Sequence, residues 1–421
     1  MSPDKAPVPR TMQAVTANGR GLDNVRVAEV PVPEPGPDQL LARVDAAGVC
    51  TSILKLVDQA EEHAYLNGWD ISRWPIILGD EGAITLVQVG ANLTDRYRPG
   101  QRFAIQPAVD TAPIVHRERY RDQARHMRKC AVGYTLQGHL AQYILVQEEV
   151  LAGQCLLPLP ADDLPHYAVS MAEPISCIVS AQERHVHIRR PSPHEPRVAD
   201  LGLLKDGVTV VCGAGAMGRM HAELALRFSP AVLIVVDLQK PRLDRVAETL
   251  ETPARDRGCR LICVLPEALE ATLRDVGAQR GGADDFILAV GVREVQQQAL
   301  GLLADGGVAN LFGGLPKGKH TLELNALDVH YREIRVVGSS GGGAGDLAGA
   351  LQAIARRHID PGNYVAGVGS LDNAPDVLRM IENAEIEGKA ILYPHIRPTP
   401  LRRVHAWSPE AEADFLRERA P

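Results

Sequence analysis

The sequence predicts an α/β protein with two domains, a mainly β domain followed by a doubly wound parallel sheet. Its 421 residues exceed the roughly 100 to 200 that one domain usually takes. Short β-prone runs fill the first 170 residues, whereas apolar strands alternate with helical stretches from about Glu173 to Gly338. Such alternation is typical of a parallel sheet with right-handed crossovers. We therefore assign residues 1–172, completed by 339–421, to the first domain and residues 173–338 to the second.

The β-prone runs of the first domain are separated by proline and glycine, which mark turns. These runs are Met12–Thr16, Gln39–Ala46, Ile84–Val89 and Gln142–Val146. Near the end of the chain, Leu347–Arg357 has a helical pattern. A terminal helix is predicted from Ser408, a favourable N-cap residue, and from Pro409 at the first helical position.

Six apolar runs predict the strands of the parallel sheet. They are Val208–Cys212, Ala231–Asp237, Arg260–Val264, Asp285–Val290, Val308–Phe312 and Ile334–Val337. The polar, proline-rich stretch Glu183–Asp206 precedes them and is interpreted as an inserted loop. Cys259 and Cys263 would lie on one face of a strand, so we expect both to be core residues.

Composition excludes several classes of protein. A hydrophobic fraction of 45% and a charged fraction of 23% are ordinary for a globular chain, and the net charge of −7 does not favour nucleic acid. The longest apolar stretches are far shorter than the roughly 20 residues that span a bilayer, so we expect no membrane contact. The N-terminus lacks the apolar core of a signal peptide, and seven scattered cysteines do not resemble a disulfide framework. We therefore expect reduced cysteines and a cytoplasmic protein.

The strongest motif is VTVVCGAGAMG at 208–218, in which a strand leads through GxGxxG into a helix. Gly213 permits the tight turn, Gly215 lets the backbone approach a pyrophosphate, and Gly218 allows close packing of helix on strand. The helix N-terminus then offers unpaired N–H groups to the phosphates. A carboxylate at Asp237, where the next predicted strand ends, is placed to bind the ribose hydroxyls of a dinucleotide.

The same carboxylate favours NAD over NADP, because Asp237 would repel a 2′-phosphate. Leu238 and Gln239 offer no cation, although Lys240 and Arg242 lie nearby. The residues expected to bind the cofactor belong to the motif and to the ends of later strands: Gly213, Gly215, Ala216, Met217, Gly218, Asp237, Val290 and Gly313.

Three further elements carry a thiolate and carboxylates: GVCTS at 48–52, GDEG at 79–82 and AEPISC at 172–177. Together with the dinucleotide motif, they resemble the zinc-dependent medium-chain alcohol and polyol dehydrogenases over nearly the whole chain. Within that family, VHY at 329–331 and SSGGG at 339–343 are most similar to the L-sorbose-1-phosphate reductase-like group. The resemblance implies a GroES-like catalytic domain, a Rossmann domain, a catalytic zinc and a homodimer or homotetramer.

Carried over by position, the resemblance gives each site residue a role. Cys50 matches the cysteine ligand, Asp80 the position usually held by histidine, Glu81 the acid beside it and Glu173 the acid of the Glu-Pro element. Ser52 matches the hydroxyl that passes the alcohol proton to solvent. The resemblance thus implies five catalytic residues, of which all but Ser52 are metal ligands.

The chain departs from the family where GDE replaces GHE. Zinc accepts aspartate oxygen, so binding remains feasible, but three anionic ligands would outweigh the metal's charge and lower its Lewis acidity. A pocket without zinc, or one that binds another divalent ion, remains an alternative.

The single residues also have simpler interpretations, because Cys50 alone could be a buried hydrophobe and Glu173 could cap a helix. The family's second, structural zinc on four cysteines is excluded, because the stretch 96–138 contains only Cys130.

These elements predict hydride transfer between nicotinamide and a secondary alcohol or ketone. An aromatic content of only 4% favours a polar substrate, namely a polyol, sugar phosphate or cyclitol. The basic stretch His116–Lys129 could bind a substrate phosphate or form a solvated helix face. The glycine run Gly338–Gly345 could wrap a phosphate or serve as a hinge.

Two other functions remain open. An enzyme that retains NAD and uses transient oxidation for epimerisation or elimination would tolerate a weak or absent zinc. A non-catalytic sensor of dinucleotides would keep the fold, but it would have no need for Cys50, Ser52 and Glu173 together.

Overall fold

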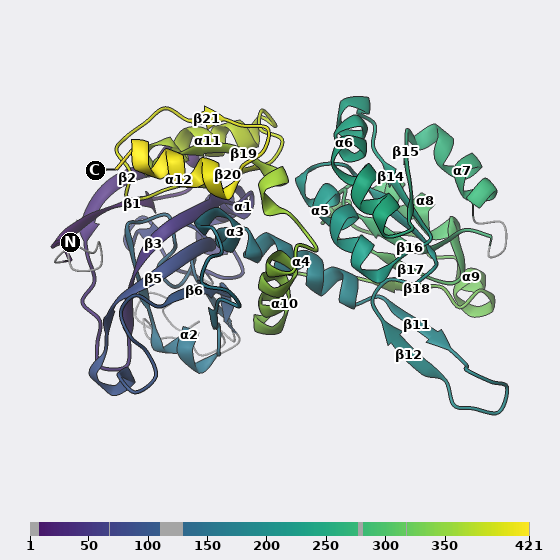
Figure 1. Ribbon diagram of the computed structural model, residues 1–421, viewed down its shortest axis with the longest axis horizontal. Coiled ribbons are helices and arrows are strands. Elements are labelled where there is room, and N and C mark those ends of the chain that lie inside the picture. Colours follow the sequence, from purple (N-terminus) through teal and green to yellow (C-terminus); the bar gives the residue numbers. More distant parts are fainter. Residues whose placement is uncertain (1–7, 67, 110–128, 277–280, 317, 421) are drawn as a thin grey trace. The chain divides into compact units, whose positions relative to one another are not determined.

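The structure, a computed structural model, describes residues 8–66, 68–109, 129–276, 281–316 and 318–420. The chain divides into two compact units (Figure 1). The first unit comprises residues 1–174, 343–356 and 360–421, and the second comprises residues 175–342 with 357–359. Most of the basic stretch His116–Lys129 lies outside the described residues.

The first unit is built on an eight-stranded sheet whose central strand, β3, pairs with both neighbouring and distant parts of the chain. The order is β10-β6-β5-β3-β20-β19-β21, and β9 also pairs with β3. The bounds are β3 (Leu40–Val49), β5 (Glu81–Val89), β6 (Arg102–Ile105), β9 (Tyr143–Val146), β10 (Leu156–Pro158), β19 (Val365–Gly369), β20 (Lys389–Leu392) and β21 (Arg402–Arg403). The last segment of the chain therefore completes the sheet that the first segment begins.

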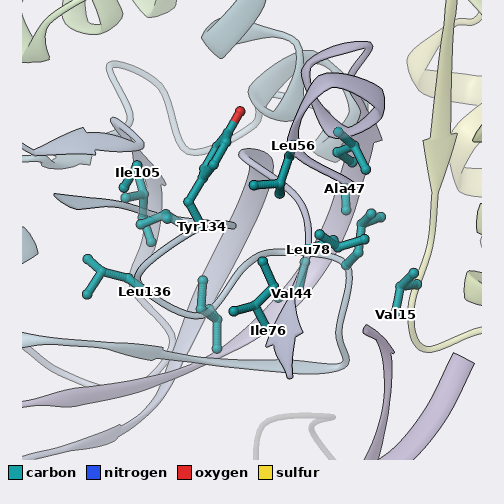
Figure 2. Packing of buried hydrophobic residues seen from close by; sticks show 14 of the residues in the cluster. Val15, Val44, Ala47, Leu56, Ile76, Leu78, Ile105, Tyr134 and Leu136 are labelled. Atoms are coloured by element: carbon teal, nitrogen blue, oxygen red, sulfur yellow. The ribbon is translucent and has the colours of Figure 1, made fainter. Parts of the chain in front are cut away.

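A three-stranded sheet and several short helices complete this unit. The sheet contains β1 (Thr11–Ala17), β2 (Val25–Pro31) and β4 (Ile76–Ile77), and β7 (Ala108–Val109) pairs with β8 (Cys130–Ala131). The helices are α1 (Ser52–Gln59), α2 (Glu148–Ala152), α3 (His166–Ser170), α10 (Ala344–Ala355), α11 (Ala374–Glu382) and α12 (Pro409–Glu418). Their aliphatic side chains bury one core, and Figure 2 shows the Tyr134 ring at this core with its hydroxyl directed away from the neighbouring aliphatic groups.

Helix α12 begins where the sequence predicts, because the Ser408 side chain accepts a hydrogen bond from the Ala411 N–H. The buried carboxylate of Glu412 accepts the backbone N–H groups of His166 and Tyr167, both at 2.8 Å. It also accepts the Tyr393 hydroxyl at 2.9 Å. The terminal helix is thereby anchored to two other elements of the first unit.

The second unit confirms the predicted doubly wound parallel sheet. Its order, β15-β14-β13-β16-β17-β18, reads 3-2-1-4-5-6 from the first strand of the unit's parallel sheet. The strands are β13 (Val208–Cys212), β14 (Val232–Val236), β15 (Arg260–Val264), β16 (Ala283–Leu288), β17 (Leu303–Asn310) and β18 (Arg335–Val337). The crossing helices are α5 (Ala216–Ala225), α6 (Lys240–Asp256), α7 (Leu269–Val276), α8 (Arg293–Gly301) and α9 (Ala326–Tyr331). Cys259 and Cys263 pack in one hydrophobic cluster of this unit.

One prediction about the second unit was wrong. The stretch expected as an inserted loop contains an antiparallel hairpin of β11 (Val186–Arg189) and β12 (Val198–Leu201), which projects from the unit in Figure 1. It follows α4 (Ala172–Glu183), the helix that runs from the first unit into the second. Among the helices of the described ranges, none combines the length and apolar character needed to cross a membrane.

Candidate functional site

Adjacent strands of the first unit bring together residues that are far apart in sequence. Cys50 follows directly after β3, Glu81 begins β5, and Lys389 begins β20. In register, Gly48 of β3 faces Glu81 on one side and Ile391 of β20 on the other. One end of three adjacent strands therefore carries a thiol, two carboxyl groups and an ammonium group, since Asp80 immediately precedes β5.

The ligand atoms of Cys50, Asp80 and Glu81 all lie within 4.8 Å of one another. The Glu81 side chain is fully buried, and Asp80 is 7% exposed. Glu173, the fourth residue that the resemblance implied, is not in this group of the described residues. Its charge is nevertheless near enough to raise the pKa of the Cys50 thiol.

Burial dominates the electrostatics of the cluster. It raises the pKa of the Cys50 thiol well above its ordinary value, and the charge of Asp80 raises it further. Burial also raises the pKa of the Asp80 carboxyl, although a hydrogen bond from Ser52 opposes this. Without a cation, the three groups would therefore resist ionising together.

Lys389 supplies a positive charge that the charge balance of the predicted ligands did not include. Its ammonium forms a buried ion pair with Oε1 of Glu81. Burial lowers the pKa of Lys389, but the charges of Glu81 and Cys50 outweigh burial and raise it above its ordinary value. Three anionic ligands would be balanced by a divalent ion together with Lys389. Lys389 thus offsets one of the ligand charges, whereas Glu173 adds a negative charge near Cys50.

The hydroxyl groups of Ser52 and Tyr134 lie near the Asp80 carboxylate. Ser52, the first residue of α1, donates from Oγ to Oδ2 of Asp80 at 2.8 Å. The Tyr134 hydroxyl is near enough to Asp80 to be affected by its charge. Burial, followed by the negative charge of Asp80, raises the pKa of Tyr134 above its usual range. The Tyr134 hydroxyl therefore keeps its proton at neutral pH.

Glycine makes the close approach of these elements possible. A Cβ at Gly48 would lie 2.1 Å from Oε2 of Glu81, and a Cβ at Gly82 would lie 2.2 Å from the ring of His139. Burial lowers the pKa of His139 to about 4, so this side chain is a neutral packing partner of the loop that carries Asp80.

The donor set fits a zinc ion. Oδ1 of Asp80 and Oε2 of Glu81 are buried and have no hydrogen-bond partner among the described residues. Leaving buried carboxylate oxygens unpaired is costly, and a cation between them and the Cys50 sulfur would remove that cost. One sulfur and two oxygens are ligands that zinc accepts, which leaves a coordination position for a substrate oxygen.

The GxGxxG motif of the second unit has the geometry that each of its glycines requires. Gly213 adopts φ 102°, in the left-handed region that suits glycine. A Cβ at Gly218 would lie 1.7 Å from the Gly213 carbonyl oxygen, whereas a Cβ at Gly215 would meet no atom within 4 Å. The space beside Gly215 and the half-buried start of α5, at Ala216 and Met217, can receive a pyrophosphate.

Asp237 follows β14 and braces the glycine loop. Its Oδ2 accepts the Ala214 N–H at 2.7 Å, and its Oδ1 accepts the Gln239 N–H at 2.8 Å. The Arg242 guanidinium lies 3.9 Å from Oδ2. Asp237 therefore stands beside the loop, as predicted, but with a cation next to it.

Val290 and Gly313, two more predicted cofactor residues, lie side by side beyond the ends of β16 and β17. A Cβ at Gly313 would lie 2.4 Å from the Val290 carbonyl carbon, and a Cβ at Gly213 would lie 2.6 Å from the Val290 side chain. The Gln296 amide donates to the Val290 carbonyl at 3.1 Å and to the Gly313 carbonyl at 2.6 Å. The carboxyl ends of the parallel strands thus form one continuous edge beside the glycine loop.

Sequence reasoning missed Lys389, Tyr134 and Gln296. A lysine at the start of a buried strand is a signal for Lys389, because buried lysine usually has an acidic partner. Tyr134 and Gln296 act through contacts with distant residues, and their local sequence gives no comparable signal.

Comparisons with known proteins agree with this architecture. The family model of the alcohol dehydrogenase GroES-like domain matches residues 36–158. Mannitol-1-phosphate 5-dehydrogenase of Aliivibrio fischeri is 28% identical over 403 residues, covering 94% of this chain and 89% of that protein. L-sorbose 1-phosphate reductase of Klebsiella pneumoniae is 27% identical over 428 residues, covering 96% and 98%.

The solved structures show the same fold. The crystal structure of 2R,3R-butanediol dehydrogenase from Bacillus subtilis superposes with a TM-score of 0.67 at 20% identity, covering 91% of this chain and 99% of that one. The fold class and the predicted resemblance are thus confirmed. The chain is therefore similar over nearly its whole length to the zinc-type medium-chain alcohol and polyol dehydrogenases, and it is an oxidoreductase of that type.

Proposed function

We propose that the protein is an NAD-dependent, zinc-assisted dehydrogenase that interconverts a secondary alcohol and a ketone of a sugar phosphate, polyol or cyclitol. The observation that carries the proposal is the cluster of Cys50, Asp80 and Glu81, with its two unpartnered carboxylate oxygens. A half-buried thiol beside two buried oxygens that lack partners is well suited to a cation, which would remove the cost of leaving those oxygens unpaired.

When bound, zinc would polarise the substrate oxygen, and the nicotinamide would exchange a hydride with the carbon that bears it. Cys50, Asp80 and Glu81 would hold the ion, and Lys389 would fix Glu81 through its second oxygen. The Ser52 hydroxyl, which donates to Asp80, would take the proton of a substrate hydroxyl and pass a proton on to solvent. In this proposal Glu173 acts through its charge near Cys50.

The second unit would bind the dinucleotide along the carboxyl edge of its sheet. The pyrophosphate would occupy the space beside Gly215, and Asp237 would accept the ribose hydroxyls, which favours NAD. Arg242 near Asp237 opposes this preference, because a guanidinium can also bind a 2′-phosphate.

The relatives support the substrate class. Their names refer to phosphorylated six-carbon compounds, mannitol 1-phosphate and L-sorbose 1-phosphate. We extend this class of substrate to the present chain as a proposal, together with polyols and cyclitols. The alternative enzyme that retains NAD was motivated by a weakened metal, and Lys389 weakens that motive by offsetting one of the ligand charges.

The test combines metal analysis with a reduction assay. Purified protein is analysed for zinc and then screened for steady NADH production with polyols, sugar phosphates and cyclitols. The proposal predicts bound zinc that depends on Cys50 and continuous NADH formation with a member of these classes. A single turnover without released NADH would instead favour the enzyme that retains its cofactor, and a zinc content that does not fall when Cys50 is replaced by serine would place the site elsewhere.

A further inference from the structure

A second cluster of possible metal ligands lies within the second unit. His185 follows α4 and His187 lies on β11, so the two alternate along an extended segment and present their side chains to one face. Both reach Asp285 of β16, and the three residues are 0%, 8% and 0% exposed, respectively. Neither the glycine loop nor the cluster at Cys50 includes any of them.

The two imidazole rings converge on a single carboxylate oxygen. Nδ1 of His185 lies 2.6 Å from Oδ1 of Asp285, and Nε2 of His187 lies 2.9 Å from the same atom. The other oxygen, Oδ2, accepts the Leu204 N–H at 2.7 Å and is thereby fixed in orientation. Two nitrogens and one oxygen, with a backbone group orienting the carboxylate, form a donor set that binds zinc in proteins.

Unpartnered polar atoms adjoin this cluster. Thr209 of β13 is next to Asp285 in register, so the two side chains lie on the same face of the sheet. Its Oγ1 is fully buried and has no hydrogen-bond partner in the described part of the chain. Nε2 of His185 is also buried and unpartnered there. This second nitrogen can carry the ring proton when Nδ1 binds a metal, and Thr209 can hold a water molecule that completes the coordination.

We propose that His185, His187 and Asp285 bind a divalent transition-metal ion, zinc foremost, at a structural site distinct from the proposed catalytic one. The site ties the hairpin β11–β12 to the central sheet. An isolated two-stranded hairpin is marginally stable in water, and here its first strand begins at the cluster itself. Asp285 pairs with Thr209, four residues before Gly213, so the site is about 13 Å along the strand from the glycine loop.

The decisive measurement is the zinc content of full-length variants in which the first site is disabled. Zinc-loaded Cys50→Ser protein, dialysed against metal-free buffer, should retain one equivalent per chain. Adding Asp285→Asn should remove it. Adding His166→Asn instead should leave this zinc bound, because that partly buried histidine belongs to neither cluster. Loss of all metal in Cys50→Ser, or full retention in Cys50→Ser/Asp285→Asn, would overturn the proposal.

Cobalt substitution gives a second readout that does not depend on activity. Cobalt bound to the Cys50→Ser protein should show visible d–d bands without the near-ultraviolet thiolate band, because the proposed ligands contain no sulfur. His187→Asn is the variant to use if Asp285→Asn does not fold, since His187 is the most exposed of the three ligands. Unchanged cobalt bands in that variant would contradict the assignment. Because these measurements need neither NAD nor substrate, failure here is distinguishable from failure of the proposed function.

Discussion

At the scale of single residues, the exchange of histidine for aspartate at position 80 is the feature that most affects chemistry. An added carboxylate beside a thiolate and Glu81 would weaken a metal as a Lewis acid if nothing compensated. Lys389 compensates from the neighbouring strand, because its ammonium is paired with Glu81 and buried with it. Compared with the family pattern, the site therefore has an anionic ligand in place of a neutral one, and the Lys389 ammonium adds a fixed positive charge nearby.

We expect Asp80→His to keep or strengthen zinc binding and Cys50→Ser to lower the zinc content by one equivalent. The histidine variant removes one negative charge while Lys389 stays, so the substrate hydroxyl should lose its proton more readily. The rising, acidic limb of the oxidation rate should then move to lower pH. Metal analysis and a pH profile of kcat check this, and unchanged zinc in Cys50→Ser would contradict the ligand assignment.

Replacing Lys389 by methionine should destabilise the first unit strongly. The change leaves Glu81 buried without its cation, and breaking a buried pair from one side costs about 3–5 kcal/mol. The double variant Lys389→Met/Glu81→Gln removes both charges and should recover most of the loss. Urea unfolding of the metal-free chains measures the difference, and equal stability of the single and double variants would show that the pair is not the cause.

Asp237→Ser should shift the cofactor preference toward NADP. Serine removes the charge that repels a 2′-phosphate, and the Arg242 guanidinium, which lies 3.9 Å from Oδ2 of Asp237, can then attract that phosphate. We expect the ratio of kcat/KM for NADP over NAD to rise by about tenfold or more, which corresponds to roughly 1.4 kcal/mol. Adding Arg242→Ala should abolish the gain, and no shift in Asp237→Ser would refute the assignment of this carboxylate.

The sequence predicted the site residues that belong to short motifs and missed those that act at a distance. Cys50, Asp80 and Glu81 lie in segments that match the family position by position. Lys389 and Tyr134 complete the site through strand pairing and loop packing over long separations in the chain. Motif spacing carries no information about such contacts.

At the scale of elements, two glycines at the start of α5, Gly215 and Gly218, have different roles. Gly215→Ala places a methyl group in open space, so thermal stability should hold while the affinity for the dinucleotide falls. Gly218→Ala forces a Cβ to within 1.7 Å of the Gly213 oxygen, so the helix must shift. That overpacking should cost about 1–3 kcal/mol as well as affinity. Calorimetry and cofactor titration of both variants test this, and equal melting temperatures would contradict it.

Predicted elements were most accurate where apolar runs were continuous. The runs Val208–Cys212 and Arg260–Val264 match β13 and β15 at both ends. The hairpin β11–β12 was missed because its two strands have only four residues each and expose much of their surface. Strand β17 begins at Leu303, five residues before the predicted start, across Asp305 and two glycines that disfavour a strand.

At the scale of the whole molecule, the first unit is discontinuous in sequence. Strand β20 pairs with β3 across more than 300 residues, with Ala390 opposite Val49. Composition changes predict a boundary near Ala172, but they cannot show which later strand returns to the first sheet. The return matters for function, because β20 delivers Lys389 to the cluster at Cys50.

We expect the protein to form a homodimer through one edge of the second unit. Strand β18 ends the parallel sheet of the described residues, and large apolar side chains are exposed on it and on α9 nearby in the chain: Leu327, Val329, Tyr331 and Val336. An open strand edge with an apolar surface favours pairing with a second copy about a twofold axis. Tyr331→Glu combined with Val336→Lys should therefore yield a monomer, as measured by light scattering. Leu238→Glu, at an 83% exposed position after β14, is the matched control and should leave the dimer intact. A monomeric wild-type chain, or a dimer that survives the double change, would reject this interface.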